Sequence, residues 1–228
     1  WGVSDENLFG LANEVFKKHG DKPFFALVLT TSNHDPYEFP DGRIELYKQP
    51  KASRQNTIKY ADYAIGKFFE TAKKESYYAN TVFLVIADHS TKLHGRSLIP
   101  IQKFHIPGFI LAPHIKPAVY EKLASQIDIT PTLLDIMGIS TDLPVIGRPL
   151  LQIPQDTPGR AIMQYGTMHA LMVDANIVLQ QPDKKPMQFI VSGEQLNPCA
   201  LDPELAKDAL AYALLPDYIA SKKLYRLP

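Results

Sequence analysis

Side chains suited to metal or phosphate chemistry follow two apolar runs in this chain. Asp88 and His89 come directly after the run at 81–87, and His94 lies five residues beyond His89. His34 follows an earlier apolar run in the same way. Ligands of open α/β sheets bind beyond the carboxyl ends of the strands. Imidazole and carboxylate are a ligand set for zinc or manganese, and the charge of Asp88 would offset that of the cation. The pattern therefore indicates a metal-assisted site.

A structural interpretation of the same residues stays open. An Asp–His pair after a strand also forms hydrogen-bonded turns, and spacing alone does not separate the two cases. His34 lies among Ser32, Asn33 and Asp35, which are common turn formers. These histidines therefore suit a turn as well as a site.

The elements that would position these groups are those of an α/β fold. The apolar runs at 24–30 and 81–87 favour strands that are covered on both faces, and a helical periodicity lies between them. A strand, helix, strand succession makes a right-handed parallel crossover the expected connection. We therefore predict a mainly parallel sheet flanked by helices. The predicted helices run from the Ser4 cap to Gly20, from the Asn56 cap to Asn80 and from Asp128 to Gly138, and a third strand is predicted at 109–111.

Frequent prolines change the character of the chain after residue 149. Short apolar segments around 161–165, 170–173 and 177–180 predict antiparallel strands, and a tail helix is predicted near 203–214. We therefore expect residues 1–150 to belong to an α/β catalytic domain. Residues 151–228 are expected to form a small C-terminal β-rich subdomain, mostly antiparallel, with a tail helix.

The composition argues against several other classes of protein. Lys and Arg total 24 and Asp and Glu total 24, so the formal charge is zero, which argues against nucleic acid as a partner. The single cysteine, Cys199, excludes an internal disulfide framework and a cysteine-based zinc site. No G-x-S-x-G elbow surrounds Ser90 and no glycine-rich phosphate loop occurs, so neither a serine hydrolase nor a nucleotide cofactor is indicated.

Six short segments between residues 1 and 150 form a recognisable series. They are WGVSDE at 1–6, TTSNHDPY at 30–37, IKYADYAI at 58–65, DH at 88–89, DITPTLL at 128–134 and GRPL at 147–150. In content, order and spacing, the series resembles the C-terminal part of the catalytic domain in the sulfatase and alkaline-phosphatase superfamily. The similarity is to the branch of lipoteichoic acid synthases and phosphoglycerol transferases.

The resemblance implies roles for individual residues. Asp88 and His89 would ligate a divalent metal, Mn²⁺ in the first place, with Zn²⁺, Ca²⁺ and Mg²⁺ as alternatives. His34 would bind the phosphate or phosphoglycerol group of the substrate, and His94 would be a catalytic residue facing the phosphate or the leaving group. A cation and two imidazoles could together neutralise a phosphoryl group during transfer. Ser90 and Thr91 replace the glycine that usually follows the Asp–His pair, so the turn there is expected to differ.

The function implied is metal-dependent phosphoglycerol transfer from a phospholipid donor to a glycan or polymer acceptor. It would pass through a phosphothreonine whose nucleophile lies upstream of this chain. The alternatives are a sulfatase or phosphoethanolamine transferase on the same scaffold, or a catalytically inactive binding module. We expect the chain, which begins at Trp1, to be part of an extracytoplasmic (periplasmic or cell-surface) domain. Upstream helices would anchor that domain in the cytoplasmic membrane. With half of the site absent, the chain alone is expected to be inactive.

Overall fold

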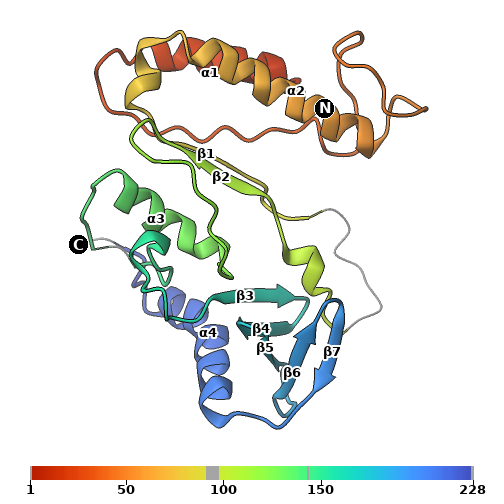
Figure 1. Ribbon diagram of the computed structural model, residues 1–228, viewed down its shortest axis with the longest axis vertical. Coiled ribbons are helices and arrows are strands. Elements are labelled where there is room, and N and C mark those ends of the chain that lie inside the picture. Colours follow the sequence, from red (N-terminus) through yellow and green to blue (C-terminus); the bar gives the residue numbers. More distant parts are fainter. Residues whose placement is uncertain (1, 91–97, 143, 227–228) are drawn as a thin grey trace. The chain divides into compact units, whose positions relative to one another are not determined.

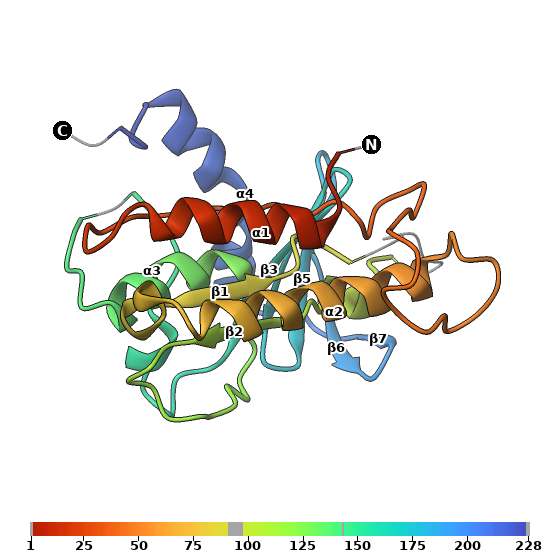
Figure 2. The same ribbon diagram turned by 90° about the horizontal axis from the view of Figure 1, so that it is seen from above.

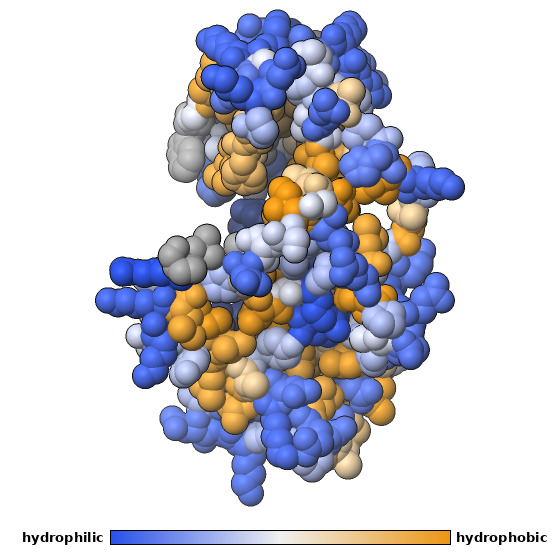
Figure 3. Space-filling model, turned by 90° about the vertical axis from the view of Figure 1, so that its left-hand side faces the viewer, coloured by the Kyte–Doolittle hydropathy of each residue, from blue (hydrophilic) through white to orange (hydrophobic). Residues whose placement is uncertain are grey.

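The computed structural model describes residues 2–90, 98–142 and 144–226. The chain forms two compact units, Trp1–Thr81 and Val82–Pro228 (Figure 1). Hydrophobic side chains reach the surface of the molecule among hydrophilic ones (Figure 3). Within the described residues, no helix combines the length and the apolar character that crossing a membrane requires.

The N-terminal unit is built on two helices, α1 (Asp5–Lys17) and α2 (Arg54–Ala72), which lie side by side (Figures 1 and 2). The helix predicted after Ser4 is confirmed, with Ser4 at the N-cap and acidic residues in the first turn, where the helix dipole favours negative charge. In α2, the buried Tyr60 and Ala64 pack with Phe39. This small core connects the helix to the loop that follows residue 30.

The second predicted helix is confirmed, but its ends differ. Ser53, not Asn56, is the N-cap, and α2 ends at Ala72, whereas Asn80 belongs to the short 3-10 helix η1 (Ser76–Asn80). Asn56 is fully buried and holds the preceding loop: Oδ1 accepts from the N–H of Tyr47 at 2.8 Å, and Nδ2 donates to the carbonyl of Lys48 at 2.8 Å. The polar residue therefore serves the loop rather than the helix end.

The predicted strand at 24–30 is absent from both sheets of the described residues. The segment is extended, and its alternate residues Phe25, Leu27 and Leu29 are 89%, 83% and 70% exposed. A continuous apolar run indicates that a segment is suited to burial in a sheet. Strand formation also requires a neighbouring strand whose backbone completes the hydrogen-bond ladder. The prediction of a strand covered on both faces is therefore wrong for this segment, both in its pairing and in its burial.

The C-terminal unit begins with a two-stranded sheet. β1 (Phe83–Ile86) pairs with β2 (Gly108–Leu111), with Phe83 opposite Leu111 and Ile86 opposite Gly108. The strands predicted at 81–87 and 109–111 are confirmed in place, but they run antiparallel. A parallel pair needs a crossover connection, usually a helix, and the described part of this connection contains only the short 3-10 helix η2 (Ile101–Phe104).

The second sheet of this unit is an antiparallel five-stranded meander. Its strands, in spatial and chain order, are β3 (Arg160–Tyr165), β4 (Met168–Val173), β5 (Asn176–Gln180), β6 (Met187–Ser192) and β7 (Gln195–Pro198). The three predicted strands and the tail helix are confirmed, the helix as α4 (Pro203–Ser221), while β6 and β7 were not predicted. Both sheets are antiparallel, so the expectation of a mainly parallel sheet is wrong for the described residues.

The two faces of the meander bury different residues, as the alternation of side chains along a strand requires. Leu171 and Val178 pack against Ala206 and Ala209 of α4, so the helix covers one face (Figure 1). On the other face a cluster gathers around Ile99. Its buried members are Ile99, Met163, Met168, Ala170, Ile177 and Leu179.

A buried carboxylate joins helix α3 (Ile129–Ile136) to the segment before β3. Asp128 ends the 3-10 helix η3 (Gln126–Asp128) and is fully buried. Its Oδ1 accepts from the N–H of Arg148 at 2.8 Å and its Oδ2 from the N–H of Ser125 at 3.0 Å. Gly147 is required beside it, because a Cβ there would lie 1.9 Å from the carbonyl oxygen of Ile127. The DITPTLL and GRPL segments are therefore two halves of one structural junction.

A buried tyrosine predicts a stability change at high pH. Tyr77 donates to Asn13 Oδ1 at 2.5 Å, and burial raises its pKa from 10.0 to about 12. The folded state favours the neutral phenol, so this contribution to the free energy of unfolding is complete below pH 10 and is lost as the pH rises through about 12. We expect Tyr77→Phe to flatten the fall in stability across this range, measured by urea denaturation at stepped pH. The exposed Tyr47→Phe should keep the wild-type slope, and an unchanged slope in Tyr77→Phe would contradict the assignment.

Candidate functional site

The Asp88–His89 pair forms an exposed turn at the end of β1. The last backbone bond of the two-stranded sheet runs from Ala87 N to Pro107 O at 3.1 Å, and the chain then turns. Asp88 Oδ1 accepts from the N–H of His89 at 2.8 Å, which closes the turn. The two side chains are 72% and 68% exposed. The hydrogen-bonded turn that the sequence allowed is therefore present, and it leaves both functional groups accessible.

The ring of His89 contacts the backbone through Nδ1, which lies 3.0 Å from the carbonyl oxygen of Ser90. A neutral ring that donates through this contact keeps its lone pair on Nε2. Metal-binding histidines usually donate their second ring N–H in this way. Nε2 lies 3.4 Å from Asp88 Oδ2, so two donor atoms lie close enough to bind one cation.

One residue that the sequence analysis missed stabilises this turn. Gln126, in η3, donates from Nε2 to the carbonyl oxygens of Ala87 and Asp88, both at 3.2 Å. A glutamine carries no sequence signal for this role, because its partners are backbone atoms 38 and 39 residues away.

The residues present fit part of a divalent metal site. Carboxylate oxygen and imidazole nitrogen are suitable donors for manganese or zinc, but such ions take about four to six ligands. Within the described residues, no group of three or more His, Cys, Asp or Glu side chains could hold a metal ion. His94, which was predicted to be catalytic, lies outside the described residues.

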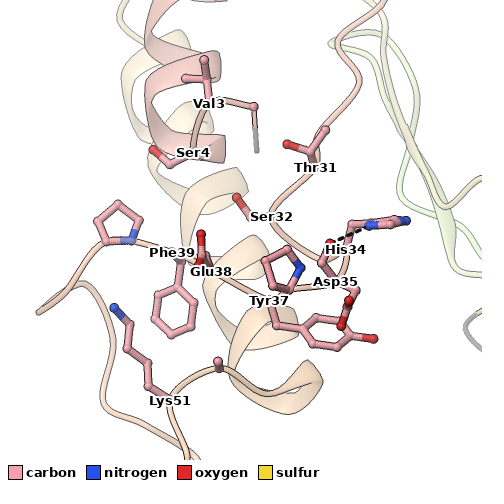
Figure 4. Close-up of a pocket in the computed structure, with 14 residues that line it drawn as sticks. Val3, Ser4, Thr31, Ser32, His34, Asp35, Tyr37, Glu38, Phe39 and Lys51 are labelled. Carbon is pink, nitrogen blue, oxygen red and sulfur yellow. Dashed lines mark hydrogen bonds between the residues drawn. The ribbon is translucent and has the colours of Figure 1, made fainter.

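His34 belongs to the other unit and lies on a tight turn. Its N–H donates to the carbonyl of Thr31 at 3.0 Å, and Tyr37 N donates to its carbonyl at 2.7 Å. The ring Nδ1 lies 2.9 Å from the carbonyl oxygen of Asp35, so His34 makes the same kind of contact with the backbone as His89 (Figure 4). The expectation that a cation held by Asp88 and His89 acts with the ring of His34 on one phosphoryl group stays a prediction, because these residues belong to different units.

His34 lines a pocket of about 480 Å³ within the N-terminal unit (Figure 4). Polar groups on its walls include the hydroxyls of Ser4 and Ser32, and Lys51, which pairs with Asp41 and lies 4.9 Å from the centre of the Phe39 ring. The pocket is lined by Gly2, Val3, Ser4, Thr31, Ser32, His34, Asp35, Pro36, Tyr37, Glu38, Phe39, Pro40, Lys51 and Ala52. It has room for a small polar group beside the imidazole.

An exposed Asp–His pair at a strand end supplies the donor types that hold the metal in enzymes that cleave or transfer esters, and a histidine on a pocket supplies a group that can contact an anion. The family model described as Sulfatase matches residues 1–139, which is more than half of the chain. The chain therefore belongs to the sulfatase family, within the sulfatase and alkaline-phosphatase superfamily, and its relatives place it in the lipoteichoic acid synthase branch.

Individual relatives agree with this assignment. Lipoteichoic acid synthase 1 of Bacillus subtilis (strain 168) is 27% identical over 168 residues, which cover 62% of this chain and 26% of the relative. Lipoteichoic acid synthase of Staphylococcus aureus (strain USA300) matches with the same identity and coverage. The chain thus spans 26% of the length of these curated relatives.

Solved structures show the same fold. A protein in the alkaline phosphatase superfamily from Vibrio parahaemolyticus superimposes with a TM-score of 0.95 at 39% identity, covering all of this chain and 57% of that one. Ps i-CgsB superimposes with a TM-score of 0.64 at 17% identity, over 97% of this chain and 55% of that one, a likeness that shows the fold alone.

Proposed function

We propose that the chain is part of a metal-dependent phosphoester transferase that moves a phosphoglycerol group. The observation that carries the proposal is the Asp88–His89 turn, where a carboxylate oxygen and an imidazole nitrogen lie 3.4 Å apart on an exposed strand end. Membership of the sulfatase family and similarity to lipoteichoic acid synthases support the reaction class.

In this proposal Asp88 and His89 hold a divalent metal, Mn²⁺ in the first place, with Zn²⁺, Ca²⁺ and Mg²⁺ as alternatives. The bound metal supplies Lewis-acid polarisation of a phosphoryl oxygen. His34 binds a phosphate oxygen of the substrate, since an imidazole on a pocket can donate a hydrogen bond to an anion when protonated. His94 acts as a catalytic residue that faces the phosphate or the leaving group.

The proposed reaction takes phosphoglycerol from a phospholipid donor. A threonine hydroxyl, supplied from outside this chain, attacks phosphorus, and the bond between phosphorus and the lipid oxygen breaks, which releases a diacylglycerol. The hydroxyl of a glycan or growing polymer then attacks the phosphothreonine and regenerates the threonine. The proposal places this chemistry in an extracytoplasmic domain that is anchored in the cytoplasmic membrane by helices outside this chain.

The test uses the full-length protein in detergent with Mn²⁺ and three substrates: a fluorescent phosphatidylglycerol, a phosphatidylethanolamine and an aryl sulfate. We expect diacylglycerol release from phosphatidylglycerol alone, and loss of that activity with EDTA. Release from phosphatidylethanolamine would identify a phosphoethanolamine transferase instead, and aryl sulfate cleavage a sulfatase. Metal-independent binding with no turnover of any substrate would identify a binding module.

A further inference from the structure

The loop that carries His34 is attached to the start of α1 through a buried carboxylate. Asp5, the first residue of α1, is 1% exposed. Its Oδ1 accepts from the N–H of Ser32 at 3.1 Å and from the N–H of Thr31 at 3.3 Å. In return, the N–H of Asp5 donates to Ser32 Oγ at 3.2 Å. The helix start and the loop thus exchange hydrogen bonds in both directions.

These bonds extend to the histidine through one further bond. Thr31 donates its N–H to Asp5, and its carbonyl oxygen accepts a hydrogen bond from the N–H of His34 at 3.0 Å. His34 itself is exposed, so packing does little to fix its backbone. The turn that carries the ring of His34 is therefore anchored to Asp5 through Thr31.

A second contact reaches the same loop from α2. Thr57 is fully buried, and its Oγ1 donates to Asn33 Oδ1 at 3.1 Å. The same hydroxyl lies 3.0 Å from the carbonyl of Arg54 and 3.4 Å from that of Ser53, so three acceptors share its single proton. Asn33 directly precedes His34, and the loop is therefore held by both helices of the unit.

The burial of the Asp5 carboxylate is unfavourable in free energy. Its Oδ2 is buried and has no hydrogen-bond partner among the described residues. An unsatisfied buried oxygen costs free energy, and the positive end of the helix dipole offsets only part of that cost. The hydrogen bonds that its carboxylate accepts within the described residues come from the loop that carries His34.

We propose that Asp5 is a positioning residue, assisted by Thr57, which holds His34 in the orientation that binds the phosphate oxygen of the substrate. The inference rests on the proposed function only in the role that it gives to His34. The structural part, that Asp5 orders residues 31–34, stands independently.

The experiment compares Asp5→Ala, Asp5→Asn and His34→Ala in the full-length protein, with Glu14→Ala as the matched control, because Glu14 is an exposed acid on the same helix. The first measurement is amide hydrogen exchange of the peptide that contains residues 31–34. Loss of the buried acceptor in Asp5→Ala should speed exchange by at least about tenfold, since local opening then exposes both N–H groups. Asp5→Asn keeps an acceptor oxygen and should exchange at close to the wild-type rate, as should Glu14→Ala.

The second measurement is diacylglycerol release. We expect Asp5→Ala to lower kcat by about ten- to a hundredfold with little change in KM, because misplacing a group that acts in the transition state lowers kcat. Asp5→Asn should restore most of the rate. If Asp5→Ala unfolds the protein, Thr57→Val supplies the same comparison.

The results distinguish the positioning role of Asp5 from the proposed function of the protein. Faster exchange at 31–34 with an unchanged kcat in Asp5→Ala, while His34→Ala is inactive, would overturn the positioning role and leave the proposed function intact. Full activity in His34→Ala would instead overturn the role of His34 in that function. Unchanged exchange in Asp5→Ala would show that Asp5 does not hold the loop.

Discussion

Replacing Asp88 by alanine in the full-length protein should remove the bound divalent metal and lower phosphoester turnover by at least about a thousandfold, because it deletes a charged donor and leaves His89 as the single ligand of this turn. The fold should be unaffected, because Asp88 is exposed and, among the described residues, its Oδ1 accepts a hydrogen bond only from the neighbouring N–H of His89. Metal content is measured by mass spectrometry after desalting, and turnover by diacylglycerol release.

The control for this prediction is Asp156→Ala, which removes an exposed acid from another turn of the same unit. It should retain wild-type metal content and rate. His89→Gln should behave like Asp88→Ala, since it replaces the imidazole donor. Retention of one metal equivalent by both site variants would place the metal elsewhere and remove the basis of the proposed function.

Replacing Asp128 by alanine should destabilise the C-terminal unit by about 3–5 kcal/mol, the range for removing one partner of a buried ion pair. Asp128 Oδ1 lies 3.6 Å from Arg160 Nη2, and Arg160 is only 8% exposed. The substitution would leave that guanidinium without its carboxylate and two backbone N–H groups without acceptors. The free energy of unfolding is measured by urea denaturation followed by circular dichroism.

Asp217→Ala is the comparison for this variant, because Asp217 is an exposed acid on α4 of the same unit. Its change in stability should stay within about 0.5 kcal/mol, as is usual for surface positions. Asp128→Asn should fall between the two, since it keeps one acceptor oxygen and loses the charge opposite Arg160. A loss below about 1 kcal/mol in Asp128→Ala would show that Arg160 is satisfied without it.

Elements with a strong local signal could be predicted from the sequence. The helices α1, α2 and α4 have periodic apolar residues, and the strand β1 is a short run of β-branched and apolar residues. These signals depend on residues a few positions apart, so the chain determines them locally. The partner of a strand is not local information, which is why the parallel sheet was predicted and antiparallel pairs are observed.

In the candidate site, likewise, the residue types could be predicted from the sequence, whereas their hydrogen-bond partners could not. Residue type and position after an apolar run identified His34, Asp88 and His89 as the groups to consider. The rings of the two histidines contact carbonyls of the following residues, and the support from Gln126 and Asp5 comes from distant segments. Hydrogen bonds of this kind depend on backbone geometry, which the spacing of side chains does not encode.

The order of strands in the C-terminal sheet bears on how the chain reaches its native state. Each strand from β3 to β6 pairs with the strand that follows it, so each pairing closes only a short loop. Short closures cost little entropy, and topologies rich in them fold quickly. We therefore expect the five-stranded sheet to form early in folding. Helix α4 would then pack against the apolar face of a sheet that has already formed.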